Sequence, residues 1–215
     1  MLATLSHVRR RRRSLARRFD VARQMDAIEE TCIPSYLHRN PAAAAVAWMR
    51  LFGAARLYRR FAPPGPVLDF GAASGELAHV LPSGVPYEFC ELDDHMARSL
   101  LAGNPSAVRR RLEDLEAGRY AAIFALDSLE HNDDVKAIIA RLRPALRPDG
   151  VFILSGPTEN WLYRLGRRMA GFSGAYHKTT IYHIERDAAE HLALVRRRAL
   201  PLGVPLFSVS CWRAR

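Results

Sequence analysis

A turn of small residues follows the short apolar run Val67–Phe70, and its composition suits a ligand that approaches the backbone closely. The alternating small residues are Gly71, Ala73 and Gly75, and Asp69 stands two positions before the first of them. Small side chains let a ligand reach the main chain, and the amide groups of a following helix start can hold a carboxylate. We therefore expect a ligand-binding turn at this position.

The spacing of this turn argues against a dinucleotide. The second and third glycines of the fingerprint G-x-G-x-x-G are replaced by Ala73 and Glu76. A second apolar run, residues 87–90, is followed directly by Glu91. A carboxylate at the end of a second strand can accept hydrogen bonds from both hydroxyls of a ribose. The turn and Glu91 together favour an adenosine-containing ligand without a pyrophosphate.

The elements that must position these residues alternate in kind along the chain. Apolar runs at 66–70, 87–91, 108–112, 121–126 and 151–155 alternate with helical patterns at 76–81, 95–102 and 135–146. This alternation is typical of β-α-β units and predicts a parallel sheet, whose strands end at one ligand-binding edge. Residues 194–200 and 206–212 are separated by a short turn, which predicts two final strands that pair antiparallel.

The N-terminal part of the chain has helical patterns instead. Apolar residues between Ser14 and Thr31 recur at a spacing that predicts one amphipathic helix. Asn40 and Pro41 suit the cap and first position of a second helix, which is expected to run to Phe61. The sequence therefore predicts an N-terminal helical extension before the alternating region.

At these positions the sequence resembles the class I S-adenosylmethionine-dependent methyltransferases, whose first motif is an acid, any residue, and then alternating glycines. Asp69, Gly71 and Gly75 match this motif, while Ala73 replaces the middle glycine. The resemblance implies an α/β fold: a Rossmann-like, seven-stranded, mostly parallel sheet with an antiparallel C-terminal strand and helices on both faces. It implies a methyltransferase domain at 63–215, preceded by a basic arm and helices at 1–62, and S-adenosyl-L-methionine as cofactor.

The resemblance also implies a set of cofactor-binding residues. Glu91 matches the family's ribose-binding acid, a loose match in the third strand region falls on the segment that flanks adenine, and an acid follows the fourth strand. The residues expected to bind the cofactor are Asp69, Gly71, Ala73, Gly75, Glu91, Leu92, Glu113, Asp114 and Asp127. Leu129-Glu130-His131 is similar to the Leu-Glu-His signature of the ubiquinone-type, small-molecule branch of the family.

Two histidines are candidates for catalysis. Transfer to a hydroxyl or an acidic carbon requires removal of a proton by a base of near-neutral pKa, whereas an acceptor that is already nucleophilic needs none. His131 is the first candidate base and His177 the second. A cap or packing role for His131, and a surface or packing role for His177, are the alternatives. The histidine and cysteine spacings do not suggest a metal site.

The segment 156–165 after the fifth strand is expected to continue as a helix to Ala170, with Trp161, Leu165 and Met169 on one face. Plain core packing is the favoured interpretation of this face. The alternative is a lid that opens to admit an apolar or lipid-linked acceptor.

The net charge of +10 allows a polyanionic partner. Part of this charge comes from Arg9–Arg13, which could form a solvated arm or contact an anionic membrane peripherally, with nucleic acid less favoured. No apolar stretch approaches the ~18–20 residues of a membrane span, and the three cysteines do not suggest a disulfide framework, so a cytoplasmic protein is expected.

Methyl transfer to a small-molecule or lipid-linked acceptor is the function that these patterns favour. An RNA methyltransferase is the alternative within the enzyme class, although the Asn/Asp-Pro-Pro-aromatic motif of base-amino methylation is absent after the fourth strand. A noncatalytic module that retains the cofactor pocket is the alternative outside that class.

Overall fold

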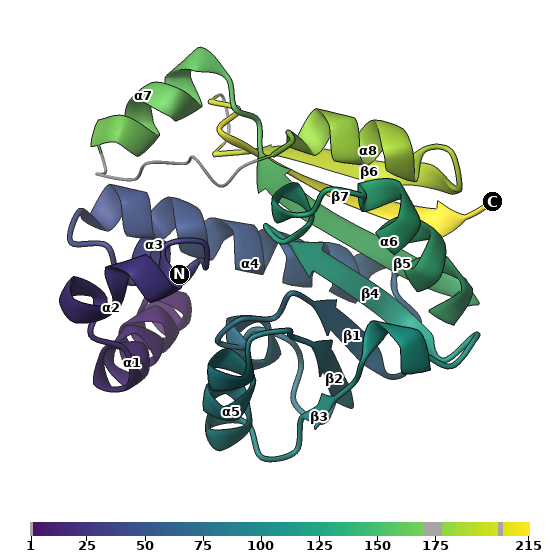
Figure 1. Ribbon diagram of the computed structural model, residues 1–215, viewed down its shortest axis with the longest axis horizontal. Coiled ribbons are helices and arrows are strands. Elements are labelled where there is room, and N and C mark those ends of the chain that lie inside the picture. Colours follow the sequence, from purple (N-terminus) through teal and green to yellow (C-terminus); the bar gives the residue numbers. More distant parts are fainter. Residues whose placement is uncertain (1, 170–177, 202–203) are drawn as a thin grey trace.

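A seven-stranded sheet forms the centre of the protein (Figure 1). The computed structural model describes residues 2–169, 178–201 and 204–215. Within these residues the strand order is β3-β2-β1-β4-β5-β7-β6, and β7 alone runs antiparallel to its neighbours. The predicted fold class is therefore confirmed. The strands are β1 (Val67–Phe70), β2 (Tyr87–Cys90), β3 (Val108–Arg109), β4 (Tyr120–Leu126), β5 (Leu146–Pro157), β6 (Leu192–Leu200) and β7 (Phe207–Ala214).

The position of β1 determines where a ligand can bind. β1 pairs in parallel with β2 on one side and with β4 on the other, so the strand order reverses at this point. Connections that leave the carboxyl ends of β1 and β4 diverge there and open a crevice at the edge of the sheet. The turn after β1 and the segment after β4 therefore face each other across this crevice.

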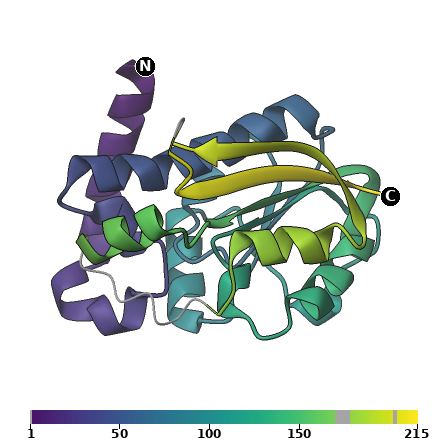
Figure 2. The same ribbon diagram turned by 90° about the horizontal axis from the view of Figure 1, so that it is seen from above.

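Helices cover both faces of the sheet, and the view from above separates α4 from α8 on opposite sides (Figure 2). Val67 packs on the face that α1, α4 and α5 cover, whereas its neighbour Leu68 packs on the face that α6 and α8 cover. This alternation is expected, because successive side chains of a strand point to opposite faces. The helices are α1 (Leu2–Arg18), α2 (Val21–Ile28), α3 (Ile33–Leu37), α4 (Pro41–Phe61), α5 (Asp94–Gly103), α6 (Val135–Leu142), α7 (Trp161–Met169) and α8 (Ile181–Ala188).

The N-terminal helices differ in part from the prediction. A single helix over 14–31 is wrong, because α1 ends at Arg18 and α2 begins at Val21. Asp20 lies between them with an extended backbone, and its side chain accepts hydrogen bonds from the first amides of α2. The prediction for α4 is confirmed: the helix runs from Pro41 to Phe61, and the Asn40 side chain caps it.

Four further elements were misjudged from the sequence. The expected helix at 76–81 is a short 3-10 turn, η1 (Glu76–His79), and the strand β3 has only two residues. Helix α8 was not predicted. The core-packing interpretation of α7 is wrong, because none of its residues is buried. Among the described residues, no helix has the length and apolarity to cross a membrane.

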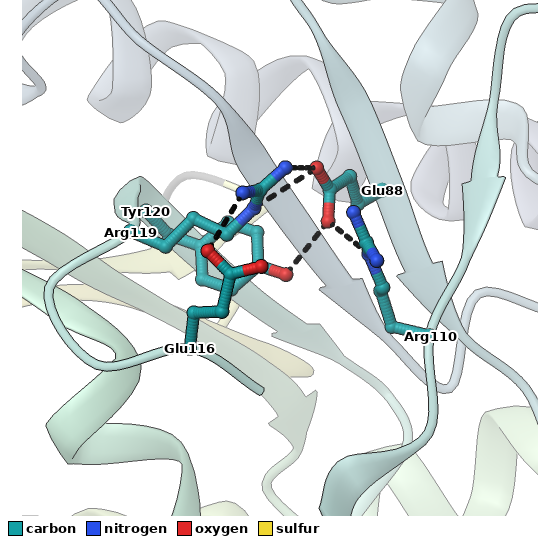
Figure 3. A network of polar contacts seen from close by, with 5 residues as sticks. All are labelled: Glu88, Arg110, Glu116, Arg119 and Tyr120. Carbon is teal, nitrogen blue, oxygen red and sulfur yellow. Dashed lines mark hydrogen bonds and ion pairs between the residues drawn. The ribbon is translucent and has the colours of Figure 1, made fainter. Parts of the chain in front are cut away.

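A buried carboxylate ties together the strands that flank β1. Glu88 on β2 accepts hydrogen bonds from Arg110, Arg119 and the Tyr120 hydroxyl, the last at 2.8 Å (Figure 3). Burial alone would raise the pKa of Glu88, but these donors outweigh it and lower that pKa to about 2. The network joins β2 to the start of β4 across β1, and so fixes the strands whose carboxyl ends border the crevice.

Candidate active site

The turn after β1 has the backbone conformation that its small residues allow. Gly71 and Gly75 have φ values of +70° and +73°, and Ala73 also lies in the left-handed region at +44°. A Cβ on Gly71 would lie 2.4 Å from the Cβ of Ser128, the second residue after β4. Glycine at position 71 is thus required both by the backbone angle and by the close approach of that residue.

Glu91 holds this turn in place from the end of β2. One carboxylate oxygen accepts a hydrogen bond from the Ala73 amide at 2.8 Å, and the other accepts one from the Asp93 amide at 3.0 Å. Each carboxylate oxygen has a further lone pair, so the side chain can still accept hydrogen bonds from a ligand. Its placement suits the ribose-binding role expected from the sequence.

Asp69 is a buried acid below the turn. Burial raises its pKa to about 7, although the hydrogen bond that the Tyr87 hydroxyl donates to the carboxylate acts in the opposite direction. A buried carboxyl near neutrality is typical of functional sites, although structural pairs show the same shift. Here it sits next to the ligand-binding turn.

A cavity of about 1020 Å³ opens between the turn, β2 and the segment after β4. It brings together most of the residues expected to bind cofactor or to act on the acceptor. The expected residues that line it are Asp69, Gly71, Ala73, Glu91, Leu92, Glu113, Asp127 and His131.

Two expected cofactor-binding residues do not line this cavity. Gly75 packs against α5, where an added Cβ would lie 2.5 Å from a side-chain carbon of Leu100. Asp114 is exposed and pairs with Arg111 at 2.9 Å. Glu113, rather than Asp114, faces the cavity from the segment that was expected to flank adenine. The second candidate base, His177, lies outside the described residues.

The structure adds an ion pair that the sequence did not indicate. Arg50 reaches from α4 to Asp127, with 3.0 Å between Nη1 and Oδ2 and only 7% of each side chain exposed. The Cys32 thiol lies beside both groups, and the guanidinium stacks 4.2 Å from the ring centre of Phe207. A signal was present: Arg50 occupies the apolar face of α4 between buried residues, where an arginine requires a partner.

The charges of this group are fixed by burial and by one another. Burial opposes the charge of Arg50, but the interaction with Asp127 and smaller ones with Cys32 and two tyrosines together outweigh this effect and raise the pKa of the guanidinium. Burial raises the pKa of Cys32 to about 12, so the thiol is protonated at neutral pH. Glu130, in the turn η3 (Leu129–His131) after Asp127, is also buried, and burial raises its pKa well above the usual range. The Arg50–Asp127 pair therefore lies among neutral groups.

Helix α1 supports the small-residue turn at the cavity, which corrects the interpretation of the basic segment as a solvated arm. Arg11 pairs with Glu76 at 2.8 Å, immediately after the small-residue turn, and Arg18 donates a hydrogen bond to the carbonyl of Ser74. Arg12 donates to the carbonyls that end α3. Arg9, Arg10 and Arg13 remain exposed. The segment is thus a helix that these arginines and the buried Leu15 attach to the folded domain.

The described residues fit an adenosine-containing cofactor with an amino-acid end. Glu91 offers acceptor capacity for ribose hydroxyls, and the absence of a side chain at Gly71 keeps the backbone accessible. Among the described residues, Asp127 Oδ1 and Ser128 Oγ are buried without a hydrogen-bond partner. Buried polar atoms of this kind usually have a partner, so the cavity wall provides polar groups for a ligand. No group of three metal-ligating side chains occurs in the described part of the chain.

The family is established by comparison of the sequence. Residues 36–201 match the model of a family described as "Methyltransferase domain", which covers more than half of the chain. The chain therefore belongs to this family. Among curated proteins, none matches the chain in sequence.

Solved structures show the same fold. The N-methyltransferase NodS from Bradyrhizobium japonicum WM9, in complex with S-adenosyl-L-homocysteine, has a TM-score of 0.68 at 14% identity, over 89% of this chain and 97% of that one. The PH0226 protein from Pyrococcus horikoshii OT3 has a TM-score of 0.63 at 14% identity, over 79% and 92%. A TehB-like SAM-dependent methyltransferase from Corynebacterium glutamicum ATCC 13032 Kitasato has a TM-score of 0.58 at 18% identity, over 82% and 100%.

The fold and the family define a class I methyltransferase. More particularly, the protein is a methyltransferase that depends on S-adenosyl-L-methionine, as the motif from Asp69 to Gly75 implied.

Proposed function

We propose that this enzyme methylates a small-molecule or lipid-linked acceptor, as in the ubiquinone-type branch of the family. The observation that carries the proposal is the extent of the cavity. It continues from Glu91 and the small-residue turn to Cys32, Tyr36 and His131. Its volume of about 1020 Å³ is at the upper end of the ~300–1,000 Å³ of typical small-molecule pockets. We infer that the cofactor and an acceptor occupy it side by side.

On the cofactor side, the protein's task is to bind and orient. When bound, S-adenosyl-L-methionine supplies a methyl group that its sulfonium already activates. Glu91 is proposed to accept hydrogen bonds from the ribose hydroxyls, and Leu92 and Glu113 to border the adenine. The turn at Gly71 and Ala73 is proposed to leave space for the amino-acid end, with Asp127 Oδ1 as an acceptor for its ammonium group. Because in-line transfer mainly requires alignment, binding residues are expected to outnumber catalytic ones.

On the acceptor side, His131 is the proposed base. It lies in the turn that follows β4 and lines the cavity together with Asn132. An acceptor hydroxyl or acidic carbon would transfer its proton to this imidazole as the methyl group arrives. His177 stays the second candidate. Tyr36 and Leu51 line the same cavity and give it partly apolar walls, which suit an acceptor with an apolar body.

Incubation of the full chain with methyl-labelled cofactor and separate lipid, small-metabolite and RNA extracts tests the proposal. Label is expected in the lipid or metabolite fraction, and the Glu91→Ala variant is expected to lose it in parallel. Label confined to RNA would overturn the proposal in favour of the nucleic-acid alternative.

A second experiment tests His131. With the acceptor that the labelling experiment identifies, His131→Ala is expected to lower kcat by ~10²-fold or more, while the Kd for S-adenosyl-L-homocysteine stays the same. An unchanged kcat would show that the acceptor needs no base at this position.

A further inference from the structure

Helix α7 is amphipathic, but it presents its apolar face to solvent. Trp161, Leu165 and Met169 are 70%, 48% and 81% exposed, and their spacing of four residues places them on one face. Tyr163 and Arg167 face the protein instead: the Tyr163 ring packs edge-on against Phe207, and Arg167 pairs with Glu159 at 2.8 Å. A helix that packed on a soluble core would have the opposite orientation.

The charges beside this apolar face are all positive. Arg164 and Arg168 are exposed next to it, and the sequence of α7 contains no acidic residue. An apolar face with large side chains, bordered by arginine, is the pattern of a helix that lies in the plane of a membrane surface. Figure 1 shows α7 at the periphery of the molecule, next to the end of β5, where a flat surface could reach it.

We propose that α7 is a membrane-surface helix, which inserts Trp161, Leu165 and Met169 among the lipids of an anionic bilayer while Arg164 and Arg168 pair with the headgroups. A second copy of the chain is a less suitable occupant. A symmetric pair would bring the arginines of both copies to one interface, whereas anionic headgroups neutralise them. The inference concerns where the enzyme is held and goes beyond the proposed methyl transfer.

The inner side of α7 leads to the cavity. Tyr163 contacts Phe207, with 5.1 Å between ring centres, and Phe207 stacks on the guanidinium of Arg50, which pairs with Asp127 in the cavity wall. These side chains form a continuous row from α7 to the cavity wall. A membrane contact at α7 therefore places the bilayer at the outer end of this row. Such a contact suits an acceptor that is itself dissolved in the lipid.

The tryptophans of the chain allow a direct test with the full-length protein. Trp48 and Trp212 are each 2% exposed, so a change in fluorescence on addition of vesicles reports mainly on Trp161. With phosphatidylglycerol-containing vesicles we expect a blue shift and cosedimentation, both reduced by high salt. With pure phosphatidylcholine vesicles we expect little of either. Trp161→Phe should abolish the blue shift and retain most of the cosedimentation.

Two variants of α7 test the contact itself. Leu165→Ser/Met169→Ser should reduce the bound fraction by about tenfold, and Arg164→Gln/Arg168→Gln should reduce it on anionic vesicles. The matched control is Leu194→Ser on β6, a leucine of similar exposure, 45%, which should bind like the unmodified protein. The affinity of each variant for S-adenosyl-L-homocysteine shows that it is folded, and keeps this test separate from that of the proposed function.

Several outcomes would overturn the inference. One is equal sedimentation of Leu165→Ser/Met169→Ser and the unmodified protein. Another is loss of vesicle binding only in an Arg9→Gln/Arg10→Gln/Arg13→Gln variant, which would place the contact on α1. A third is a blue shift that appears without vesicles and increases with protein concentration, together with a dimer detected by light scattering. This result would show that a second copy of the chain covers the apolar face of α7.

Discussion

Arg50 on α4 and Asp127 after β4 form an ion pair across the protein, with 3.0 Å between their charged atoms and 7% of each side chain exposed. The pair joins an N-terminal helix to the strand whose end borders the cavity. Its desolvation is costly, and removal of one partner leaves the other charge buried and uncompensated.

Arg50→Met should therefore destabilise the protein by ~3–5 kcal/mol, measured by urea unfolding, whereas Arg50→Met/Asp127→Asn should recover much of the loss. The exposed pair of Lys136 and Glu190 is the control, because Lys136→Met should cost only ~0–1 kcal/mol. Equal costs for the single and double variants at the buried pair would contradict this account.

Glu91→Ala should weaken binding of S-adenosyl-L-homocysteine, because it removes the proposed ribose acceptor and releases the Ala73 amide. A loss of ~1.5–3 kcal/mol, roughly tenfold to a hundredfold in Kd, is expected from calorimetric titration. Glu190→Ala removes a carboxylate elsewhere on the surface and should leave Kd unchanged. A folded Glu91→Ala protein with the original Kd would show that the ribose is held by another group.

Gly71→Ala should lower both stability and cofactor affinity. The new Cβ would lie 2.4 Å from that of Ser128, in addition to the strain of a φ of +70°. Gly118→Ala separates backbone strain from the steric contact, because Gly118 has a φ of +64° but no neighbour within 4 Å. The control should lose only ~1–2 kcal/mol and retain affinity. If both variants lose the same stability and bind cofactor equally, the contact with Ser128 has no effect.

Asp69 should make stability depend on pH. Its folded pKa of about 7 lies above the value of ~3.9 expected in the unfolded chain, so between these values the unfolded state binds fewer protons and stability falls as pH rises. Above pH ~7 this contribution is constant. Asp69→Asn should remove it, so the stability of the variant relative to the unmodified protein should rise from pH 5 to pH 8. Parallel curves for the two proteins would exclude a raised pKa at Asp69.

Arg11→Gln should weaken cofactor binding although Arg11 does not line the cavity. Loss of the 2.8 Å pair with Glu76 loosens the residue that follows Gly75, and a cost of about 1 kcal/mol would raise the Kd for S-adenosyl-L-homocysteine roughly fivefold. Arg10→Gln on the exposed side of α1 is the matched control and should have no effect. Equal affinities of the two variants would show that other contacts fix the turn.

The sequence by itself determined where the small-residue turn and Glu91 lie on the edge of the sheet. The turn from Gly71 to Gly75 and the acid Glu91 follow apolar strands whose lengths and order are local properties, and parallel strands necessarily end at one edge. The same reasoning predicted the sheet and the helix from Pro41 to Phe61. This reasoning failed where a single residue marks the end of one helix and the start of the next. At Asp20, one side-chain cap divides α1 from α2.

Tertiary structure alone decided the pairs of Arg50 with Asp127 and of Arg11 with Glu76, the latter 65 residues apart, and the outward orientation of Trp161 on α7. An arginine in a helix and an acid after a strand have many possible partners. Which one is reached depends on the angle at which the helix packs on the sheet. Periodicity likewise indicates that a helix has an apolar face, but not whether that face contacts the core or solvent. In α7 the orientation depends on the contacts of the opposite face, where Tyr163 packs on Phe207 and Arg167 pairs with Glu159.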